Sequence, residues 1–374
     1  MSAMVSAGWT AWQPQNEGDK RTTSASTTAS NLEHQVESEV SGFSSTPLSH
    51  EEQDSQVVFF SADQVQYWVP GRFWMEGHLQ AASRNRGQVY QMCDIVTGRR
   101  VAVKYMPNRW VCGSHADFMS QHPGEIERPW VGMGYAAYLS NIGYPYACPV
   151  VGVFRNVEAT LFVTDLAKCD IFSWAANCKL PPGPAREALG RPLARQILDA
   201  VRLLHDLSIV HHDVSAENIL LSCRAGKGSP LIQLIDFGTS TSARWLRGCA
   251  RGKPSYQAPE AFSDALCDGF LTDAFAIGVT LYVLLVGEYP WRSTRPSSCK
   301  TFDYFKKNGF KAMVEKRKLP GKSVTVAQCL SAPLIELLAG LLEIDPARRL
   351  TLGEAEGGYD HRSQSVWQQP WIAL

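Results

Sequence analysis

Three short motifs in the second half of the chain carry the side chains best suited to chemistry. They are His-His-Asp-Val-Ser-Ala-Glu-Asn at residues 211–218, Asp-Phe-Gly at residues 236–238 and Ala-Pro-Glu at residues 258–260. Their carboxylate and amide groups are of the types that accept protons or bind Mg²⁺. Each motif alone is common by chance. Three in this order, with an apolar run at residues 231–235 before the second, indicate one functional site.

Together these motifs resemble the catalytic half of a protein kinase, with its H-R-D-L-x-x-x-N, D-F-G and A-P-E sequences. The resemblance implies that Asp213 accepts the proton of a substrate hydroxyl group. It also implies that Asn218 and Asp236 each bind a Mg²⁺ ion. The expected reaction is transfer of the γ-phosphoryl group of ATP to a protein substrate.

Val-Ala-Val-Lys at residues 101–104 is similar to the kinase V-A-I-K strand, whose lysine binds the α and β phosphates of ATP. Because side chains alternate along a strand, Val101 and Val103 are predicted to share one face. Ala102 and Lys104 then share the other. Lys104 is therefore expected to face the cleft beside a small residue that leaves room for adenine.

The resemblance extends from about residue 75 to the C-terminus. Residues 161–166 resemble the strand and hinge that bind adenine through backbone groups, with Thr164 as a small gatekeeper and Ala167 as the hinge N–H donor. Asp170 occupies a position where an acidic residue often meets the ribose. The other nucleotide contacts implied by the resemblance are Val89, Asp165 and Leu220.

Two further segments resemble kinase elements that support the site. Residues 273–278 resemble the D-x-W-x-x-G start of a helix, whose aspartate, here Asp273, caps backbone amides of the catalytic loop. Residues 345–349 resemble a D-P-x-x-R segment, where Arg349 is expected to pair with Glu260. A buried ion pair of this kind contributes more to specific docking than to stability.

The finer resemblance is to calcium/calmodulin-dependent-type serine/threonine kinases of protists, including oomycetes and alveolates. It rests on Ser215 in the catalytic loop and on Gly-Lys-Pro-Ser-Tyr at residues 252–256. Gln-Pro-Trp at residues 369–371 resembles the H-P-W that ends such domains. We therefore expect no appended autoinhibitory or calmodulin-binding segment.

Composition limits the class of protein. The 374 residues contain 36 Lys and Arg and 36 Asp and Glu, so no global basic field favours nucleic acid or an anionic membrane as the main partner. The ten cysteines include no C-x-x-C pair, which indicates reduced thiols and a cytoplasmic or nuclear location. Residues 1–11 lack the pattern of an export signal. The longest apolar run, residues 274–286, is too short to span a membrane.

Strands are predicted in the first half of the chain. Residues 1–60, rich in Ser, Thr, Gln and Glu, are expected to form a disordered tail. The β-branched and aromatic runs at residues 87–92 and 99–105 predict an antiparallel hairpin, with a turn at Thr97 and Gly98.

Helical periodicity follows Asp165. Pro192 suits a first helical position, and residues 273–288 predict a buried helix. The core-facing stripe after Pro192 consists of Leu193, Ile197, Val201 and Leu204. This order favours an α+β, bilobal protein kinase fold over residues 65–374. We expect a small antiparallel β-sheet lobe with one helix at residues 65–165 and a larger helical lobe at residues 166–374.

The glycine-rich loop departs from the kinase pattern. Counting back from Val89, the three glycine positions are Ala82, Arg84 and Gly87, so only the last glycine is kept. Side chains at 82 and 84 are expected to hinder close approach of the backbone to phosphate. Arg84 or Arg86 could supply charge instead.

The carboxylate partner of Lys104 has three possible assignments. Glu125 and Glu127 both lie at plausible distances in sequence, but Pro129 would interrupt a helix carrying either one. If the helix runs from 129 to 142, the partner's position falls near Gly132 and the ion pair is missing.

A lysine has changed place within the kinase pattern. The second residue after the catalytic aspartate is usually lysine, and here it is Ser215, whereas the threonine position of the substrate-docking loop is Lys253. Because these positions adjoin in the kinase fold, we predict that Lys253 reaches Asp213 and Ser215. It would act as a catalytic residue by stabilising charge on the transferring phosphoryl group.

The usual phosphorylation switch is also altered. The residue eleven before Glu260 is Cys249, and the arginine position of H-R-D is His212, so activity independent of phosphorylation at that position is predicted. Arg247 and Arg251 could lower the pKa of the Cys249 thiol. A merely exposed thiol is the alternative.

These departures from the kinase pattern leave two possible functions. An active serine/threonine kinase is favoured because drift that abandons chemistry has no reason to spare Lys104, Asp213, Asn218 and Asp236 together. The alternative is a pseudokinase, a scaffold or nucleotide-binding module with little or no phosphoryl transfer. A small-molecule or lipid kinase is disfavoured because residues 252–260 resemble a peptide-docking loop.

Overall fold

A computed structural model of the chain describes residues 58–82, 87–223, 230–354 and 365–373. Of the predicted tail, only residues 58–60 fall among them. Phe59 stacks on His115 at a ring separation of 4.7 Å, and the Phe60 N–H donates to the Trp130 carbonyl. Arg84 and Arg86, the predicted substitutes for the missing glycines, lie outside the described residues.

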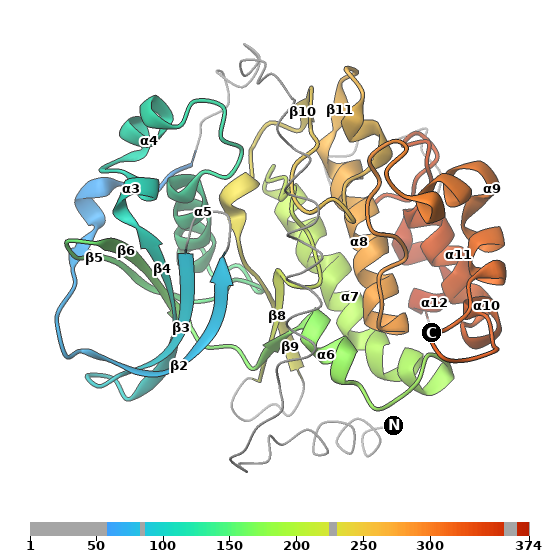
Figure 1. Ribbon diagram of the computed structural model, residues 1–374, viewed down its shortest axis with the longest axis horizontal. Coiled ribbons are helices and arrows are strands. Elements are labelled where there is room, and N and C mark those ends of the chain that lie inside the picture. The colour runs from blue at the N-terminus through green and yellow to red at the C-terminus, as the bar shows by residue number, and fades with distance from the viewer. Residues whose placement is uncertain (1–57, 83–86, 224–229, 355–364, 374) are drawn as a thin grey trace. The chain divides into compact units, whose positions relative to one another are not determined.

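Six strands form the sheet of the small lobe in the order β1-β5-β6-β4-β3-β2 (Figure 1). All neighbouring pairs are antiparallel except β1 and β5, which are parallel. The strands are β1 (Gln66–Tyr67), β2 (Phe73–Ala82), β3 (Gly87–Asp94), β4 (Arg99–Pro107), β5 (Val150–Arg155) and β6 (Ala159–Asp165).

The predicted hairpin is confirmed as β3 and β4. The Gly98 N–H closes the turn by donating to the Asp94 carbonyl, and the positive φ of 68° at Gly98 favours glycine there. Val101 and Val103 are buried in the core of the sheet, so the alternation along β4 is also as predicted. Lys104 consequently lies on the opposite face, paired in register with Val89.

The small lobe was expected to carry one helix, but two short helices precede it. These are α3 (Asn108–Val111) and α4 (His115–Gln121), followed by α5 (Pro129–Asn141). Side chains from all three pack together, with Val111, Phe118 and Trp130 fully buried. The Trp130 indole N–H also donates to the Val111 carbonyl at 2.7 Å. The extra helices therefore belong to the core that supports α5.

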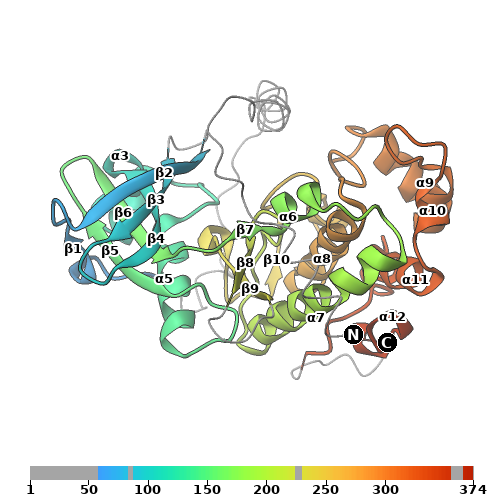
Figure 2. The ribbon, with the colours of Figure 1, turned by 90° about the horizontal axis from the view of Figure 1, so that it is seen from below.

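The large lobe is mostly helical, with a three-stranded sheet, β7-β8-β9, between its helices and the small lobe (Figure 2). Its strands are β7 (Cys169–Asp170), β8 (Ile219–Cys223), β9 (Pro230–Leu234), β10 (Trp245–Leu246) and β11 (Cys267–Asp268). Its α-helices are α6 (Ile171–Asn177), α7 (Pro184–Asp206), α8 (Gly269–Val286), α9 (Lys300–Lys316), α10 (Val326–Cys329), α11 (Ala332–Leu341) and α12 (Pro370–Ala373).

Helix α7 begins eight residues before the predicted start at Pro192. Its core stripe is as predicted, but Pro192 lies inside the helix and Pro184 occupies the first turn. Tertiary hydrogen bonds hold the added turns. The buried Arg186 donates to the carbonyls of Leu284 and Ala175, and Glu187 accepts from Ser331. These long-range partners outweigh the local preference of proline for a helix start.

Helix α8 is the buried helix expected at residues 273–288, and it begins four residues earlier. Asp268 caps it by accepting a hydrogen bond from the Phe270 N–H at 3.1 Å. Every residue of α8 is buried. At 18 residues α8 is longer than the apolar run at residues 274–286, and within the described part of the chain it is the one helix long and apolar enough to cross a membrane, so the length predicted from sequence was too short. Its complete burial is typical of a core helix.

Candidate active site

Lys104 on β4 faces Asp236, which follows β9. The Lys104 Nζ atom lies 3.2 Å from Asp236 Oδ1. Lys104 pushes the pKa of Asp236 below its ordinary value. Burial works against the charge on Lys104, but the carboxylates of Asp236, Glu127 and Asp213 outweigh it and raise the pKa of Lys104. Both groups are therefore charged at neutral pH.

The helix near Lys104 starts at Pro129, which decides between the alternatives for its partner. The expected position of a helical glutamate is Gly132, and a Cβ atom there would lie 3.1 Å from the Gly238 nitrogen. This close approach favours glycine. Glu127 precedes the helix, packs against Gly238 and contributes to the charge on Lys104. The ion pair with a residue of α5 is therefore missing, as the third alternative predicted, and Glu127, which precedes the helix, acts on Lys104 through its charge.

Asp213 and Asn218 are held together in the catalytic loop. The Asn218 side-chain amide donates to Asp213 Oδ2 at 2.7 Å and to the Asp213 carbonyl at 2.9 Å. His211 accepts from the Asp213 N–H at 3.2 Å and donates to the Ile235 carbonyl. These contacts join the loop to the segment that carries Asp236.

Asp273, in the first turns of α8, also holds the catalytic loop in place. Its two carboxylate oxygens accept the backbone N–H groups of His211 at 2.8 Å and His212 at 2.9 Å. The capping contact predicted from sequence is confirmed. His212 and Asp236 both adopt positive φ, 61° and 65°. Such left-handed conformations in residues other than glycine are costly and concentrate at functional sites.

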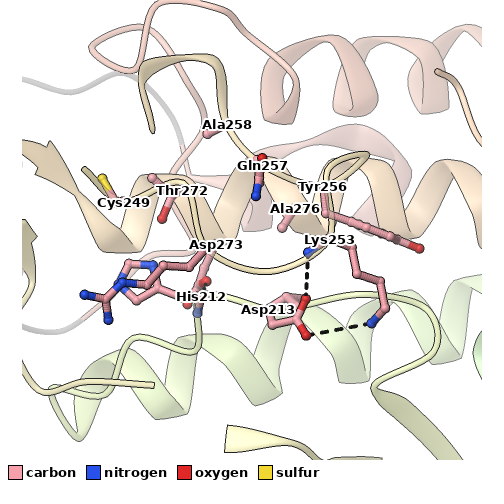
Figure 3. Close-up of a pocket in the computed structure, with 12 residues that line it drawn as sticks. His212, Asp213, Cys249, Lys253, Tyr256, Gln257, Ala258, Thr272, Asp273 and Ala276 are labelled. Atoms are coloured by element: carbon pink, nitrogen blue, oxygen red, sulfur yellow. Dashed lines mark hydrogen bonds and ion pairs between the residues drawn. The ribbon is translucent and has the colours of Figure 1, made fainter. Parts of the chain in front are cut away.

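Lys253 points into the catalytic loop, as Figure 3 shows. Its Nζ atom donates to Ser215 Oγ at 2.8 Å and to Asn218 Oδ1 at 3.3 Å. The same ammonium lies 3.7 Å from Asp213 Oδ2, the distance of an ion pair, and the Lys253 backbone N–H donates to Asp213 Oδ1 at 3.1 Å. The predicted proximity of Lys253 to Asp213 and Ser215 is present.

Asp213 is a carboxylate with a raised pKa. Burial raises it above its ordinary value, while the charge of Lys253 opposes the shift. A carboxylate that is more basic than usual is better suited to accept a proton from a hydroxyl group.

Sequence reasoning missed the neighbours that hold Lys253. Glu217 lies 4.0 Å from its ammonium and accepts hydrogen bonds from the hydroxyl groups of Tyr256 and Tyr289. At Gly252, a Cβ atom would come within 2.6 Å of Asp213 Oδ1, so only glycine allows this approach. The only signal in the sequence that could have identified Glu217 as a neighbour of Lys253 was its position in the catalytic loop.

The predicted nucleotide-binding residues come from three segments. On the sheet, Ala102 pairs with Thr164 and with Gln91, and Val89 pairs with Lys104. Leu220 is on β8, opposite Asp170.

The hinge residues have partners of their own. Asp165 accepts a hydrogen bond from Arg99 at 2.6 Å, and Ala167 lies between β6 and β7. Asp170 caps α6 by accepting from the N–H and hydroxyl groups of Ser173 at 2.6 and 2.8 Å. The carboxylate expected near the ribose therefore already has a local role.

The residues expected to hold Mg²⁺ have suitable chemistry. Asp236 supplies a carboxylate whose side chain is 37% exposed, and Asn218 supplies an amide oxygen. Mg²⁺ binds through one or two carboxylates and other oxygen ligands, often completed by substrate phosphates. The Asp236 carboxylate fits that requirement, and the Asn218 amide oxygen fits it if Mg²⁺ takes the place of the Lys253 ammonium, whose hydrogen bond that oxygen accepts at 3.3 Å.

The expectation for Cys249 was wrong in both forms. The thiol is 3% exposed, so it is not a surface thiol. A hydrogen bond with Cys267 and burial raise its pKa, so the nearby arginines do not lower it.

By contrast, the predicted pair of Arg349 and Glu260 is present, with bonds of 2.5 and 2.9 Å, and Arg349 is fully buried.

A small β-sheet lobe, a helical lobe and a strand lysine paired with the aspartate of Asp-Phe-Gly are the features of a protein kinase. The sequence supports the same class, because residues 85–372 match the family model described as protein kinase domain. This match covers most of the chain, which therefore belongs to that family.

Curated relatives are protein kinases, and some of them are named serine/threonine-protein kinases. A carbon catabolite-derepressing protein kinase of Candida tropicalis is 27% identical over 272 residues, covering 72% of this chain and 38% of that protein. Serine/threonine-protein kinase SRK2G of Arabidopsis thaliana is 34% identical over 209 residues, covering 54% of this chain and 55% of that protein. The chain thus spans about half, or less, of the length of these relatives.

Proposed function

We propose that this chain is an active kinase that transfers the γ-phosphoryl group of ATP to serine or threonine in a protein. The observation that carries the proposal is the arrangement around Asp213. Its carboxylate is held by Asn218, contacted by Lys253 and placed near the Lys104–Asp236 pair. The serine/threonine assignment also draws on similarity to the serine/threonine-protein kinase SRK2G of Arabidopsis thaliana.

The proposed mechanism assigns roles to Asp236, Asn218, Lys104 and Asp213. Mg²⁺ bound by Asp236 and Asn218 would neutralise charge on the phosphates. Asp236 and Glu127 keep Lys104 charged. The Lys104 ammonium orients the α and β phosphates of ATP. Asp213 accepts the proton of the attacking hydroxyl group, a role that its raised pKa favours.

Lys253 takes the part usually played by a lysine of the catalytic loop. Its ammonium reaches the loop from the substrate-docking segment and contacts Ser215, which stands at the usual lysine position. A fixed cation beside Asp213 stabilises negative charge that develops on the transferring group. We therefore include Lys253 among the catalytic residues with Asp213 and Lys104.

The finer family assignment remains a prediction. Similarity to calcium/calmodulin-dependent-type kinases of protists rests on Ser215 and on residues 252–256. We also propose a cytoplasmic or nuclear location, because the ten cysteines are scattered along the sequence without a C-x-x-C pair. Imaging of a tagged chain in its own cells would test the location.

Release of ADP by the purified chain with Mg-ATP and a general protein substrate tests the function. We expect turnover that falls at least a hundredfold in Asp213→Asn, since the catalytic base is lost. The matched control is Asp303→Asn, at an exposed position of α9. If wild type and Asp213→Asn release ADP equally slowly while both bind ATP, the chain is a pseudokinase.

A further inference from the structure

Two cysteines meet beside the segment that carries Lys253. Strands β10 and β11 pair antiparallel, which places Leu246 opposite Cys267. Cys249 follows Leu246 by three residues, and its thiol shares a hydrogen bond with Cys267. The two side chains belong to one apolar cluster with Ala261, and each is 3% exposed. This is a dithiol built into the fold, and the proposed phosphoryl transfer does not use it.

The two thiols differ in how firmly they are held. Cys267 Sγ donates to the Glu260 carbonyl at 3.3 Å, and the Glu260 carboxylate is fixed by the fully buried Arg349. Cys249 Sγ contacts the Leu246 carbonyl at 3.7 Å. Cys267 is therefore attached to the frame of the large lobe, whereas Cys249 belongs to the segment leading to Lys253.

The hydrogen bond also makes the two sulfurs chemically unequal. Donation from Cys249 lowers the pKa of Cys267 despite burial, and it raises the pKa of Cys249. The thiolate is the nucleophilic form of cysteine. Together with the attachment of Cys267 to the frame of the large lobe, this direction of the pKa shift assigns Cys267 as the first sulfur to react and Cys249, on the adjoining segment, as the second.

We propose that Cys249 and Cys267 are an oxidation site, at which hydrogen peroxide converts the two thiols into an intramolecular disulfide. The Cys267 thiolate attacks one peroxide oxygen, the O–O bond breaks, and the departing hydroxide takes a proton to become water. The resulting sulfenic acid is attacked by the Cys249 sulfur. A second water leaves with the Cys249 proton, so two sulfurs lose two electrons and peroxide gains them.

The disulfide has a consequence for the segment. An S–S bond measures about 2.05 Å, shorter than any hydrogen-bonded contact between sulfurs, so Cys249 must move toward β11. Only three residues separate Cys249 from Lys253, whose backbone and ammonium contact Asp213. Oxidation is therefore expected to disturb the position of Lys253.

Peptide mapping tests the site directly. The full chain is treated with hydrogen peroxide, remaining thiols are blocked by alkylation, and the digest is analysed by mass spectrometry without reduction. We expect one linked peptide pair containing Cys249 and Cys267, which separates on reduction. The link should persist in Cys299→Ser, the matched control, and be absent in Cys249→Ser. Linkage to other cysteines, or between two chains, would overturn the proposal.

Trapping the sulfenic acid tests the order of reaction. With dimedone present, Cys249→Ser should accumulate the adduct on Cys267, whereas Cys267→Ser should leave Cys249 nearly unlabelled. The reverse labelling would contradict the assignment of the first sulfur. Thermal unfolding confirms that each variant is folded, and Cys249→Ala and Cys267→Ala serve in place of a serine variant that is not.

The effect on activity rests on the proposed function and is measured separately. We expect oxidised wild type to release ADP more slowly by roughly tenfold to a hundredfold, because small displacements at an active site are costly. Reduction should restore the rate, and Cys249→Ser should be unaffected by peroxide. If the reduced chain has no activity, the proposed function fails while the peptide result still decides the oxidation site.

Discussion

The ammonium of Lys253 donates a hydrogen bond of 2.8 Å to the hydroxyl group of Ser215. In the kinase pattern the residue at position 215 would itself be the lysine. Here a lysine ammonium still lies near Asp213, but it belongs to Lys253 and not to residue 215. The contact joins two segments that are 38 residues apart. It gives the departure from the family pattern a physical meaning.

Loss of this cation should slow phosphoryl transfer. In Lys253→Thr we expect turnover to fall roughly a hundredfold or more, corresponding to about 3 kcal/mol of lost electrostatic stabilisation. The measurement is the rate of ADP release at saturating Mg-ATP. Lys300→Thr, at an exposed position, is the control.

The double variant Ser215→Lys with Lys253→Thr gives the sharper result. It returns a lysine to the catalytic loop, and we expect it to recover most of the activity lost in Lys253→Thr. Residues in contact show such coupling in a double-mutant cycle. Additive losses in the two single variants and the double variant would show that Lys253 does not supply the missing cation.

Nucleotide binding should depend on Asp236. Because a ligand that binds only the folded state stabilises it, Mg-ATP at 100 times its Kd should raise the free energy of unfolding by about 2.7 kcal/mol. Thermal unfolding with and without Mg-ATP measures this. Asp236→Ala should abolish the shift and Asp303→Ala should keep it. An equal shift in Asp236→Ala would remove Asp236 from the metal site.

Glu127 should support Lys104 from outside helix α5. Glu127→Gln removes one of the carboxylates that raise the pKa of Lys104. We expect kcat/KM for ATP to fall about fivefold, the effect of about 1 kcal/mol for a partly exposed pair. Glu125→Gln is the matched control, two residues earlier. Equal losses in both variants would mean that the segment, and not the Glu127 charge, matters.

The pH dependence of stability should reveal the buried His205. Its ring stands between Asp273 at 3.2 Å and Glu354 at 2.8 Å. Burial opposes protonation of His205, but the two carboxylates outweigh it and raise the pKa above 6.5. Because the folded-state pKa is the higher one, this stabilisation is complete below pH 6.5 and is lost as the pH rises through the folded-state pKa.

His205→Leu therefore leaves two buried carboxylates without their cation. We expect a loss of about 3 kcal/mol in the free energy of unfolding at pH 6, and a smaller loss as the pH rises. Urea titrations at several pH values measure the difference from wild type. A difference that stays constant with pH would show that His205 is neutral in the folded chain.

Activity should not need phosphorylation of the activation segment. The usual acceptor position is the buried Cys249, and His212 replaces the arginine that would bind a phosphate. Chain treated with phosphatase should therefore release ADP at an unchanged rate. A large loss traced by mass spectrometry to a phosphosite at residues 239–248 would disprove this.

Local patterns in the sequence were enough to predict much of the site. The alternation along β4 placed Lys104 on the face opposite Val101 and Val103, because strand periodicity depends only on neighbouring residues. The Asp273 cap and the Arg349–Glu260 pair also followed from motifs, since each occupies a characteristic position in the family pattern.

Other features depended on residues far apart in the chain, and only the tertiary structure decided them. Helix α7 starts before Pro192 because Arg186 is bonded to Leu284, 98 residues away. The start of α5 leaves Glu127 outside the helix, and the packing that follows β10 and β11 brings Cys249 and Cys267 into one cluster. Local periodicity carries no information about such partners, because packing and long-range hydrogen bonds determine which distant side chains meet.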